Sequence, residues 1–379
     1  MRRRSPPPSR HRRRTSTRAR STASISPRSS CAARSSSPPT DATHHVPSRR
    51  IASSTVPDNA SPDAEDRWRD LRRFLLFAYS AVLLWSIFVW GLPIDRLLVL
   101  TWMGVAFGLG AIGRSRADVK QMAKDWVALV AVYIVYDYSR GTADQLGIPV
   151  NYTLPGQLDR VLFLGRNPNV ALQWRLYDPG DVKWYDVLGS IIYMTHFVLP
   201  VVPLALLRVR NRTAWLQYLR RFALTLYISV ACFIVFPAAP PWMSARDGYT
   251  DPVARITGRG WWEIGLKTIS KTLDRGAAVM NPVAAMPSLH SGCALLVALW
   301  FTRNMGTKVR VAAMAFPLSM AVTLVYFGEH WFVDALAGWG VVLLAWNLAG
   351  RWERRNGQPE APPVFSRGSA RQSAASRTA

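Results

Sequence analysis

Two short segments hold the residue types that could do chemistry, Pro287-Ser288-Leu289-His290 and His330-Trp331-Phe332-Val333-Asp334. Each lies at the edge of a long apolar run. The chain has six histidines, and those outside its low-complexity N-terminal region are His196, His290 and His330. Ionisable groups in membrane-embedded sequence are costly and are functional candidates by default.

The spacing of His330 and Asp334 places both on one face of a helix, one turn apart. A carboxylate bonded to one imidazole nitrogen fixes the tautomer and makes the other nitrogen more nucleophilic. His330 would then attack phosphorus and form a phosphohistidine. His290 would protonate the leaving oxygen and later deprotonate the water or alcohol that resolves the intermediate. These three residues are therefore the predicted catalytic groups for displacing an alcohol from a phosphate ester.

Such a reaction also needs cationic and backbone donors for the phosphoryl oxygens. Arg140 is the predicted phosphate-binding cation. Ser288 stands at a helix start just after Pro287, where backbone N–H groups can bind an anion, although its side chain could equally serve as a helix cap. Arg140 could also be a headgroup anchor, and His196 is interpreted as a packing or hydrogen-bonding residue between helices.

The composition indicates a membrane protein. Hydrophobic residues make up 49% of the chain and charged residues 18%, and sixteen tryptophans suit interfacial belts. The net charge of +24 is concentrated in the N-terminal tail and in short loops. That placement is typical of the positive-inside rule rather than of nucleic-acid binding, so no nucleic-acid partner is expected. Three cysteines without zinc spacing predict neither a disulfide framework nor a metal site.

The apolar runs predict an all-α, polytopic membrane helix bundle of about eight spans. Residues 1–66 are expected to be a disordered basic tail rich in Ser, Pro and Arg, residues 67–351 the transmembrane catalytic domain, and residues 352–379 a disordered C-terminal tail. The predicted spans are 71–92, 94–112, 125–139, 185–207, 214–236, 286–303, 310–327 and 331–349.

The charged loops give this bundle an orientation. Basic groups follow the second, fourth and sixth spans, so those loops and both termini are predicted to be cytoplasmic, in a protein of the cell membrane. His290, His330, Asp334 and Arg140 then all reach the outer face. The charge rule made no use of the motifs, so their convergence supports an active site on the outer face.

The motifs resemble those of a known family. Pro287-Ser288-Leu289-His290 resembles the second signature of the type 2 phosphatidic acid phosphatase superfamily, usually Pro-Ser-Gly-His, and His330-x-x-x-Asp334 resembles the end of the third. The resemblance implies a six-helix catalytic core, His330 as nucleophile supported by Asp334, His290 as acid, and no required metal or other cofactor.

The chain also departs from that pattern. The first signature, Lys-x6-Arg-Pro, is absent, and Leu324 stands where an arginine usually precedes the nucleophile by six. In these departures the chain resembles the branch of the superfamily that contains inositol phosphorylceramide synthases and sphingomyelin synthases. The segments 136–141, 193–200 and 237–242 also resemble that branch.

The resemblance predicts a membrane enzyme acting on a phospholipid, or on an isoprenoid or sphingolipid phosphate. It would either hydrolyse the lipid phosphate or transfer the phosphoryl head group to an alcohol such as inositol. Three alternatives stay open: a metal-dependent membrane hydrolase using His290, His330 and Asp334 as ligands, a membrane serine protease using Ser288 or Ser291, and a non-enzymatic transporter lined by intramembrane polar residues.

Overall fold

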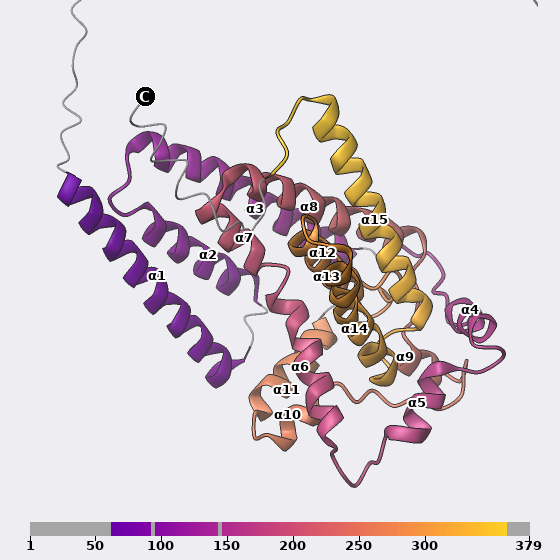
Figure 1. Ribbon diagram of the computed structural model, residues 1–379. Coiled ribbons are helices and arrows are strands. Elements are labelled where there is room, and N and C mark those ends of the chain that lie inside the picture. Colours follow the sequence, from indigo (N-terminus) through magenta and orange to yellow (C-terminus); the bar gives the residue numbers. More distant parts are fainter. Residues whose placement is uncertain (1–61, 92–94, 143–145, 280, 362–379) are drawn as a thin grey trace, which may run out of the picture. The chain divides into compact units, whose positions relative to one another are not determined.

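The computed structural model describes residues 62–91, 95–142, 146–279 and 281–361 (Figure 1). The predicted tail 1–66 lies outside the described residues apart from 62–66, and the predicted tail 352–379 is described as far as 361. The described residues form α-helices and isolated β-bridges and no strand, which confirms the predicted all-α class. The helices are α1 (Pro62–Trp90), α2 (Arg96–Ala111), α3 (Arg116–Thr142), α4 (Leu154–Leu162), α5 (Pro168–Leu176), α6 (Trp184–Val198), α7 (Val202–Arg210), α8 (Arg212–Val235), α9 (Pro241–Arg246), α10 (Arg259–Glu263), α11 (Lys267–Val279), α12 (Leu289–Thr302), α13 (Thr307–Ala313), α14 (Ala315–Tyr326) and α15 (Phe332–Arg355).

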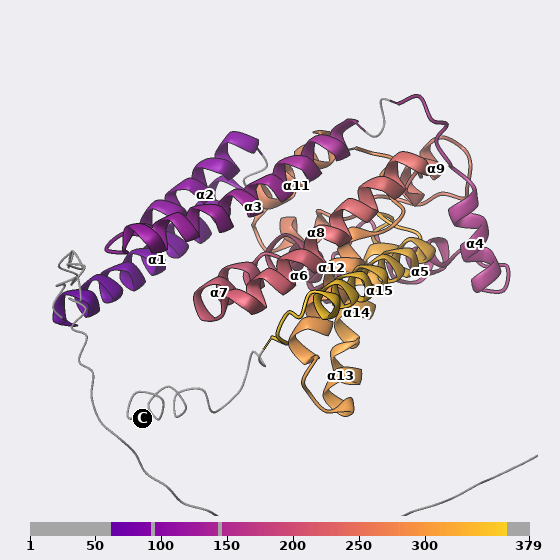
Figure 2. The same ribbon diagram turned by 90° about the horizontal axis from the view of Figure 1, so that it is seen from above.

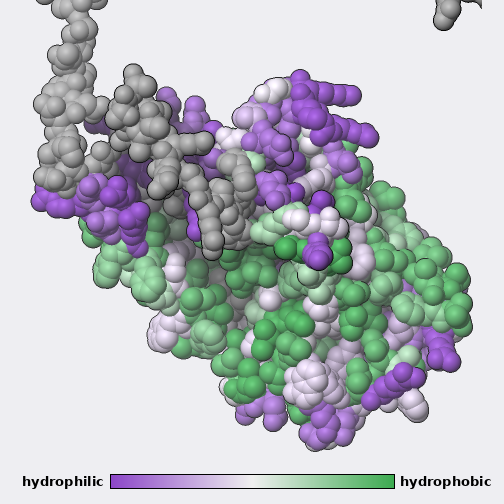
Figure 3. All heavy atoms as spheres, viewed as in Figure 1, coloured by the Kyte–Doolittle hydropathy of each residue, from purple (hydrophilic) through white to green (hydrophobic). Residues whose placement is uncertain are grey.

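Four stretches of the described chain are long and apolar enough to cross a membrane: Asp66–Trp90, Arg212–Val235, Thr307–Tyr326 and Phe332–Arg355. A fifth is added if α6 and α7, which meet at a 44° bend, count as one span. Figure 3 shows the same pattern on the face in view, a broad apolar surface with polar groups at either end. By length and composition this is an integral membrane protein.

The predicted number of eight spans is not confirmed. The sixth predicted span is α12, whose 14 residues extend about 21 Å, less than the roughly 30 Å of a hydrocarbon core. The second predicted span is α2, with 16 residues. The fourth is broken near Pro200, because a proline within a helix removes a backbone donor and crowds the preceding turn.

Helices α8, α12 and α15 lie side by side in both views (Figures 1 and 2). Between them is a core that contains the buried Tyr218, Trp300 and Val342. A second buried cluster, with Met320 and Phe327 of the α14 segment, packs against α6 and α10. These two cores fix the ends of α12 and α15 from which the predicted catalytic residues come.

Several arginines used to orient the bundle also hold buried carboxylates. Asp125 of α3 is bonded to Arg208 and Arg212, with N–O distances of 2.9 and 2.7 Å. Arg221 of α8 lies 2.7 Å from Glu353 of α15. Buried charges need such partners, because an unpaired one loses its hydration without compensation. These arginines, which lie in α7 and α8, therefore tie helices together as well as carrying charge.

Candidate active site

His330 lies in the loop that leaves α14, just before Trp331, the N-cap of α15, and Asp334 lies in the first turn of that helix. The two residues therefore meet across the helix start, and not on one face of a helix as predicted. The Nδ1 atom of His330 is 3.3 Å from Oδ2 of Asp334, and the same oxygen accepts the N–H of Trp331 at 2.9 Å. Asp334 is fully buried. Because a carboxylate oxygen can only accept, this contact places the ring proton of His330 on Nδ1 and leaves the lone pair on Nε2.

His290 is the second residue of α12 and meets His330 directly. Its Nδ1 atom lies 3.3 Å from Nε2 of His330. The three predicted catalytic residues thus form a line, Asp334 to His330 to His290. The Nε2 atom of His290 is buried and makes no hydrogen bond within the described part of the chain.

Two glycines allow α12 and α15 to approach so closely. A Cβ atom added to Gly338 would lie 2.2 Å from the carbonyl oxygen of Ser288, and one added to Gly292 would lie 3.1 Å from the oxygen of Gly338. The N–H of Ser288 also donates to the carbonyl of Asp334 at 2.8 Å. Without side chains at these positions, the helix starts carrying His290 and His330 come within hydrogen-bonding distance.

Asp159 of α4 holds the first turn of α15. It is fully buried, and its two oxygens accept the N–H groups of Phe332 and Val333 at 2.7 and 2.8 Å. A carboxylate there satisfies helix N–H groups that lack an internal partner. Burial raises the pKa of Asp159 to about 6, the two backbone hydrogen bonds oppose the rise, and the nearby Asp334 adds to it.

Two amides of α5 hold the loop between α14 and α15. Asn169 donates to the carbonyls of Val325 and His330 at 2.8 and 3.0 Å. Gln173 donates to the carbonyl of Tyr326 at 2.9 Å. Together with Asp159 they form a polar clamp on the loop between α14 and α15 and on the first turn of α15. No sequence pattern pointed to these three residues, because each of them binds a part of the chain more than 150 positions away.

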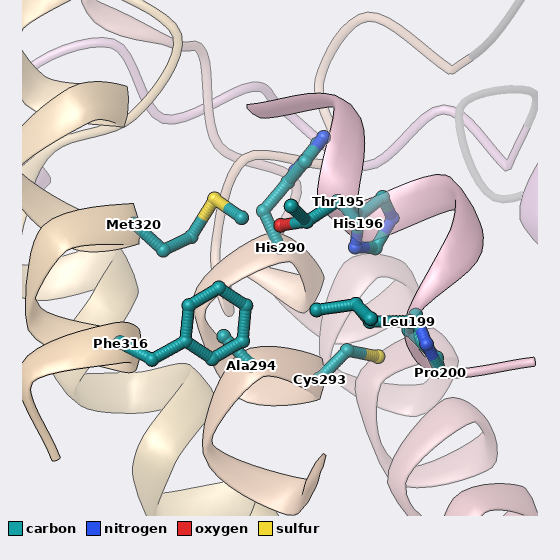
Figure 4. A pocket seen from close by; sticks show the side chains of 9 residues that line it. All are labelled: Thr195, His196, Leu199, Pro200, His290, Cys293, Ala294, Phe316 and Met320. Carbon is teal, nitrogen blue, oxygen red and sulfur yellow. The ribbon is translucent and has the colours of Figure 1, made fainter. Parts of the chain in front are cut away.

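The third folded histidine also reaches this site. The ring of His196, from α6, lies 4.0 Å from that of His290 between centroids, and the ring of Tyr193 stacks on His290 at 4.9 Å. Figure 4 shows His196 and His290 beside a narrow hollow that is otherwise lined mainly by apolar groups such as Phe316 and Met320. His196 is therefore part of the surroundings of His290, which its position within an apolar run did not reveal.

The predicted phosphate-binding residues have different surroundings. Ser288 is fully buried and caps α12, since its side chain accepts the N–H of Ser291 at 3.4 Å. Arg140 lies in the last turns of α3, and its side chain is outside the described residues. A phosphate-binding role for either stays a prediction. The structure adds Arg255 as a second candidate for the phosphate-binding cation. Its Nε atom donates to Oε1 of Glu329, the residue before His330, at 2.8 Å.

The three catalytic candidates do not converge on one point. Each ring nitrogen of His330 already faces a neighbour, Asp334 on one side and His290 on the other. Within the described residues, no three His, Cys, Asp or Glu side chains are placed to hold a metal ion. The arrangement is a line of contacts from Asp334 through His330 to His290.

The match to known proteins covers this part of the chain. A family model described as the PAP2 superfamily matches residues 159–348, half of the chain. The chain belongs to the PAP2 superfamily. The matched PAP2 region begins at Asp159 and includes the whole line from His290 to Asp334, so the clamp and the catalytic candidates lie in the family's common segment.

Two relatives place this PAP2 protein in a branch. It is 27% identical over 170 residues to the phosphoinositol dihydroceramide synthase of Bacteroides thetaiotaomicron, covering 42% of this chain and 54% of that protein. It is 34% identical over 110 residues to the inositol phosphorylceramide synthase catalytic subunit AUR1 of Saccharomyces cerevisiae, covering 27% of this chain and 26% of that protein. The alignments thus span about half or less of each relative. No solved structure matches significantly. The predicted resemblance to the inositol phosphorylceramide synthase branch is confirmed.

Proposed function

We propose that this protein is a membrane enzyme that acts on phosphorylated lipids through a phosphohistidine intermediate on His330. The observation that carries the proposal is the line of contacts from Asp334 through His330 to His290 in a chain of the PAP2 superfamily. The substrate would be a phospholipid, or an isoprenoid or sphingolipid phosphate.

The first half of the reaction forms the intermediate. The lone pair on Nε2 of His330 attacks phosphorus as the phosphorus–oxygen bond to the leaving alcohol breaks. His290 gives its proton to that leaving oxygen. Asp334 stabilises the positive charge that develops on the His330 ring. Since the two rings now touch, the phosphoryl group must part them on binding.

The second half returns the enzyme to its starting state. His290, now able to accept a proton, removes one from water or from an alcohol whose oxygen attacks phosphorus, and the nitrogen–phosphorus bond breaks. Water would give hydrolysis. An alcohol such as inositol would give head-group transfer. The two relatives are named as synthases, which favours transfer.

The membrane orientation is part of the proposal. The basic loops and both termini would be cytoplasmic, and the ends of α12 and α15 that carry His290 and His330 would face the outer side of the cell membrane. Cysteine-directed labelling of a residue at the exposed start of α13, such as Lys308, in intact cells tests this. Labelling of Lys308→Cys by an impermeant reagent would contradict the orientation.

The central experiment traps the intermediate. Purified protein in lipid vesicles is given a phospholipid or lipid phosphate labelled at phosphorus, with or without inositol, and quenched in base, where phosphohistidine survives. We expect protein-bound label that is lost in acid and absent from His330→Ala. Label in His330→Ala would contradict the nucleophile assignment, and free phosphate as the sole product with inositol present would contradict transfer.

A second assay addresses the alternatives. The proposed reaction predicts turnover that resists a metal chelator and is inhibited by vanadate, which mimics a phosphoryl group in transfer. Loss of turnover on chelation, with recovery on adding back a divalent ion, would instead support the metal-dependent hydrolase. Transport of the lipid without chemical change by His330→Ala would support the transporter.

A further inference from the structure

Helix α4 has two faces of opposite character. One is buried against the start of α15, where Asp159 accepts the N–H groups of Phe332 and Val333. Gly156 lies on this face too, and a Cβ atom there would come 2.8 Å from the Trp331 ring. These contacts fix the rotation of α4, so the direction of its other face is set as well.

The other face and the turn that follows it are apolar and exposed. The exposed fraction of the side chain is 76% for Val161, 51% for Leu162 and 94% for Leu164. Leu164 has a φ angle of 53°, a left-handed conformation that is unfavourable for a residue with a Cβ atom. The turn thus holds an apolar side chain outward in a conformation that suits glycine better.

This surface continues an apolar surface already assigned to lipid. Helix α15 exposes Leu336, Leu343 and Leu344 along its length, and it is apolar enough to cross a membrane. The rings of Phe163 and Phe332 meet edge to face with centroids 5.2 Å apart and join the end of α4 to the start of α15. Figure 3 shows hydrophobic atoms running from the region of α15 to that of α4.

We propose that Val161, Leu162 and Leu164 dock into the lipid surface, at the boundary between headgroups and acyl chains beside the active site. An amphipathic helix of this kind lies in the membrane interface with its apolar face inserted. Arg160, which pairs with Asp251 at 3.0 Å, and Arg166 are exposed on the same segment, where guanidinium groups would reach lipid phosphates. A lipid surface is favoured over a second protein because the apolar face is continuous with the lipid-facing side of α15.

The docking also connects lipid to chemistry. Val161 and Asp159, the residue that caps α15, lie on opposite faces of one nine-residue helix, and Leu164 lies in the turn beyond its end. The first turn of α15 carries Asp334, which orients His330. The lipid surface would therefore hold the exposed face of α4, while Asp159 on the buried face binds the start of α15.

The experiment uses the full chain with Cys31, Cys232 and Cys293 replaced by alanine and one new cysteine, reconstituted in vesicles of phosphatidylcholine and phosphatidylglycerol. An environment-sensitive fluorophore is attached to Leu164→Cys. Brominated lipids quench a label in the bilayer, whereas iodide quenches a label in water. Leu343→Cys on α15 serves as the lipid-facing control and Glu263→Cys, an exposed polar position on α10, as the aqueous control.

We expect the label at 164 to be quenched by brominated lipids at least half as strongly as at 343, and by iodide several-fold less than at 263. Iodide quenching equal to that at 263 would overturn the proposal. Protection from both quenchers would also overturn it, since a protein surface would then cover α4. Val161→Cys provides a second reading of the same face if Leu164→Cys does not fold.

Discussion

The Nε2 atom of His330 lies 3.3 Å from the Nδ1 atom of His290, although the two residues are 40 positions apart. The nitrogen that would attack phosphorus thus faces the group that would protonate the leaving oxygen. The roles of acid and nucleophile can nevertheless be tested separately. The acid matters only when the leaving group of the substrate needs a proton, whereas the nucleophile is needed for every substrate.

The first prediction separates acid from nucleophile. We expect His290→Ala to lower kcat by about 10²–10⁴ for an alkyl phosphate ester, as loss of a general acid does. With a nitrophenyl phosphate ester, whose leaving group needs no proton, we expect most of the first half-reaction to survive. His330→Ala should lose activity on both esters. Equal losses for His290→Ala on the two esters would contradict the acid assignment.

The second prediction concerns the carboxylate that orients the nucleophile. Asp334→Asn keeps an oxygen that can accept the Trp331 N–H but removes the charge beside His330. We expect kcat to fall about 10²–10⁴-fold, as when a histidine loses its orienting carboxylate, while KM changes little. The measurement is steady-state turnover with fluorescence-detected thermal unfolding in parallel. An unchanged kcat with a lowered Tm would show that Asp334 acts only on stability.

The third prediction tests the close approach of α12 and α15. Gly338→Ala would place a Cβ atom 2.2 Å from the Ser288 carbonyl, so we expect a loss of about 1–3 kcal/mol in stability together with a loss of activity. The matched control is Gly340→Ala on the same helix, where nothing lies within 4 Å of the new atom. It should be neutral or stabilising by about 0.5–1 kcal/mol. Similar Tm values for the two variants would contradict the steric argument.

The fourth prediction is a pH dependence from Asp159. Its pKa is about 6 in the fold against an ordinary 3.8, so the neutral carboxyl is the form that favours folding. That contribution is fully present below about pH 4 and is lost as pH rises through about 6. We therefore expect the Tm of the wild type, measured relative to that of Asp159→Asn, to decrease as the pH rises from about 4 to about 6. The exposed Asp251→Asn should show no such trend, and a relative Tm that rises with pH would contradict the sign.

The fifth prediction concerns the phosphate-binding cation. We expect Arg140→Ala to lower kcat/KM for a phosphorylated lipid by about ten- to a hundredfold, the effect of losing one hydrogen-bonded charge. Arg255→Gln removes the cation paired with Glu329 and provides the comparison. Arg246→Gln, whose partner Asp247 is its neighbour in sequence, is the control. A loss of kcat/KM confined to Arg255→Gln would show that Arg255, and not Arg140, binds the phosphate.

The sequence predicted the helical class because long apolar runs in a bilayer have no other way to satisfy their backbone. The number of spans was harder, since α12 and α2 are apolar but short and α6 breaks before α7. Whether a short apolar helix crosses the membrane, enters it part-way or only packs against other helices depends on the helices around it.

From their spacing, the sequence by itself predicted that His330 and Asp334 meet, although His330 lies before the N-cap Trp331 and the contact forms across the start of α15 rather than on one helix face. It also supplied His290 as the matching acid through the resemblance of its motif. Only the tertiary structure brought His290 to His330, through the contact of Gly292 with Gly338, and placed Asp159 on the first turn of α15. Those contacts join chain segments 40 to 173 positions apart, and no local pattern encodes which distant segment will pack there.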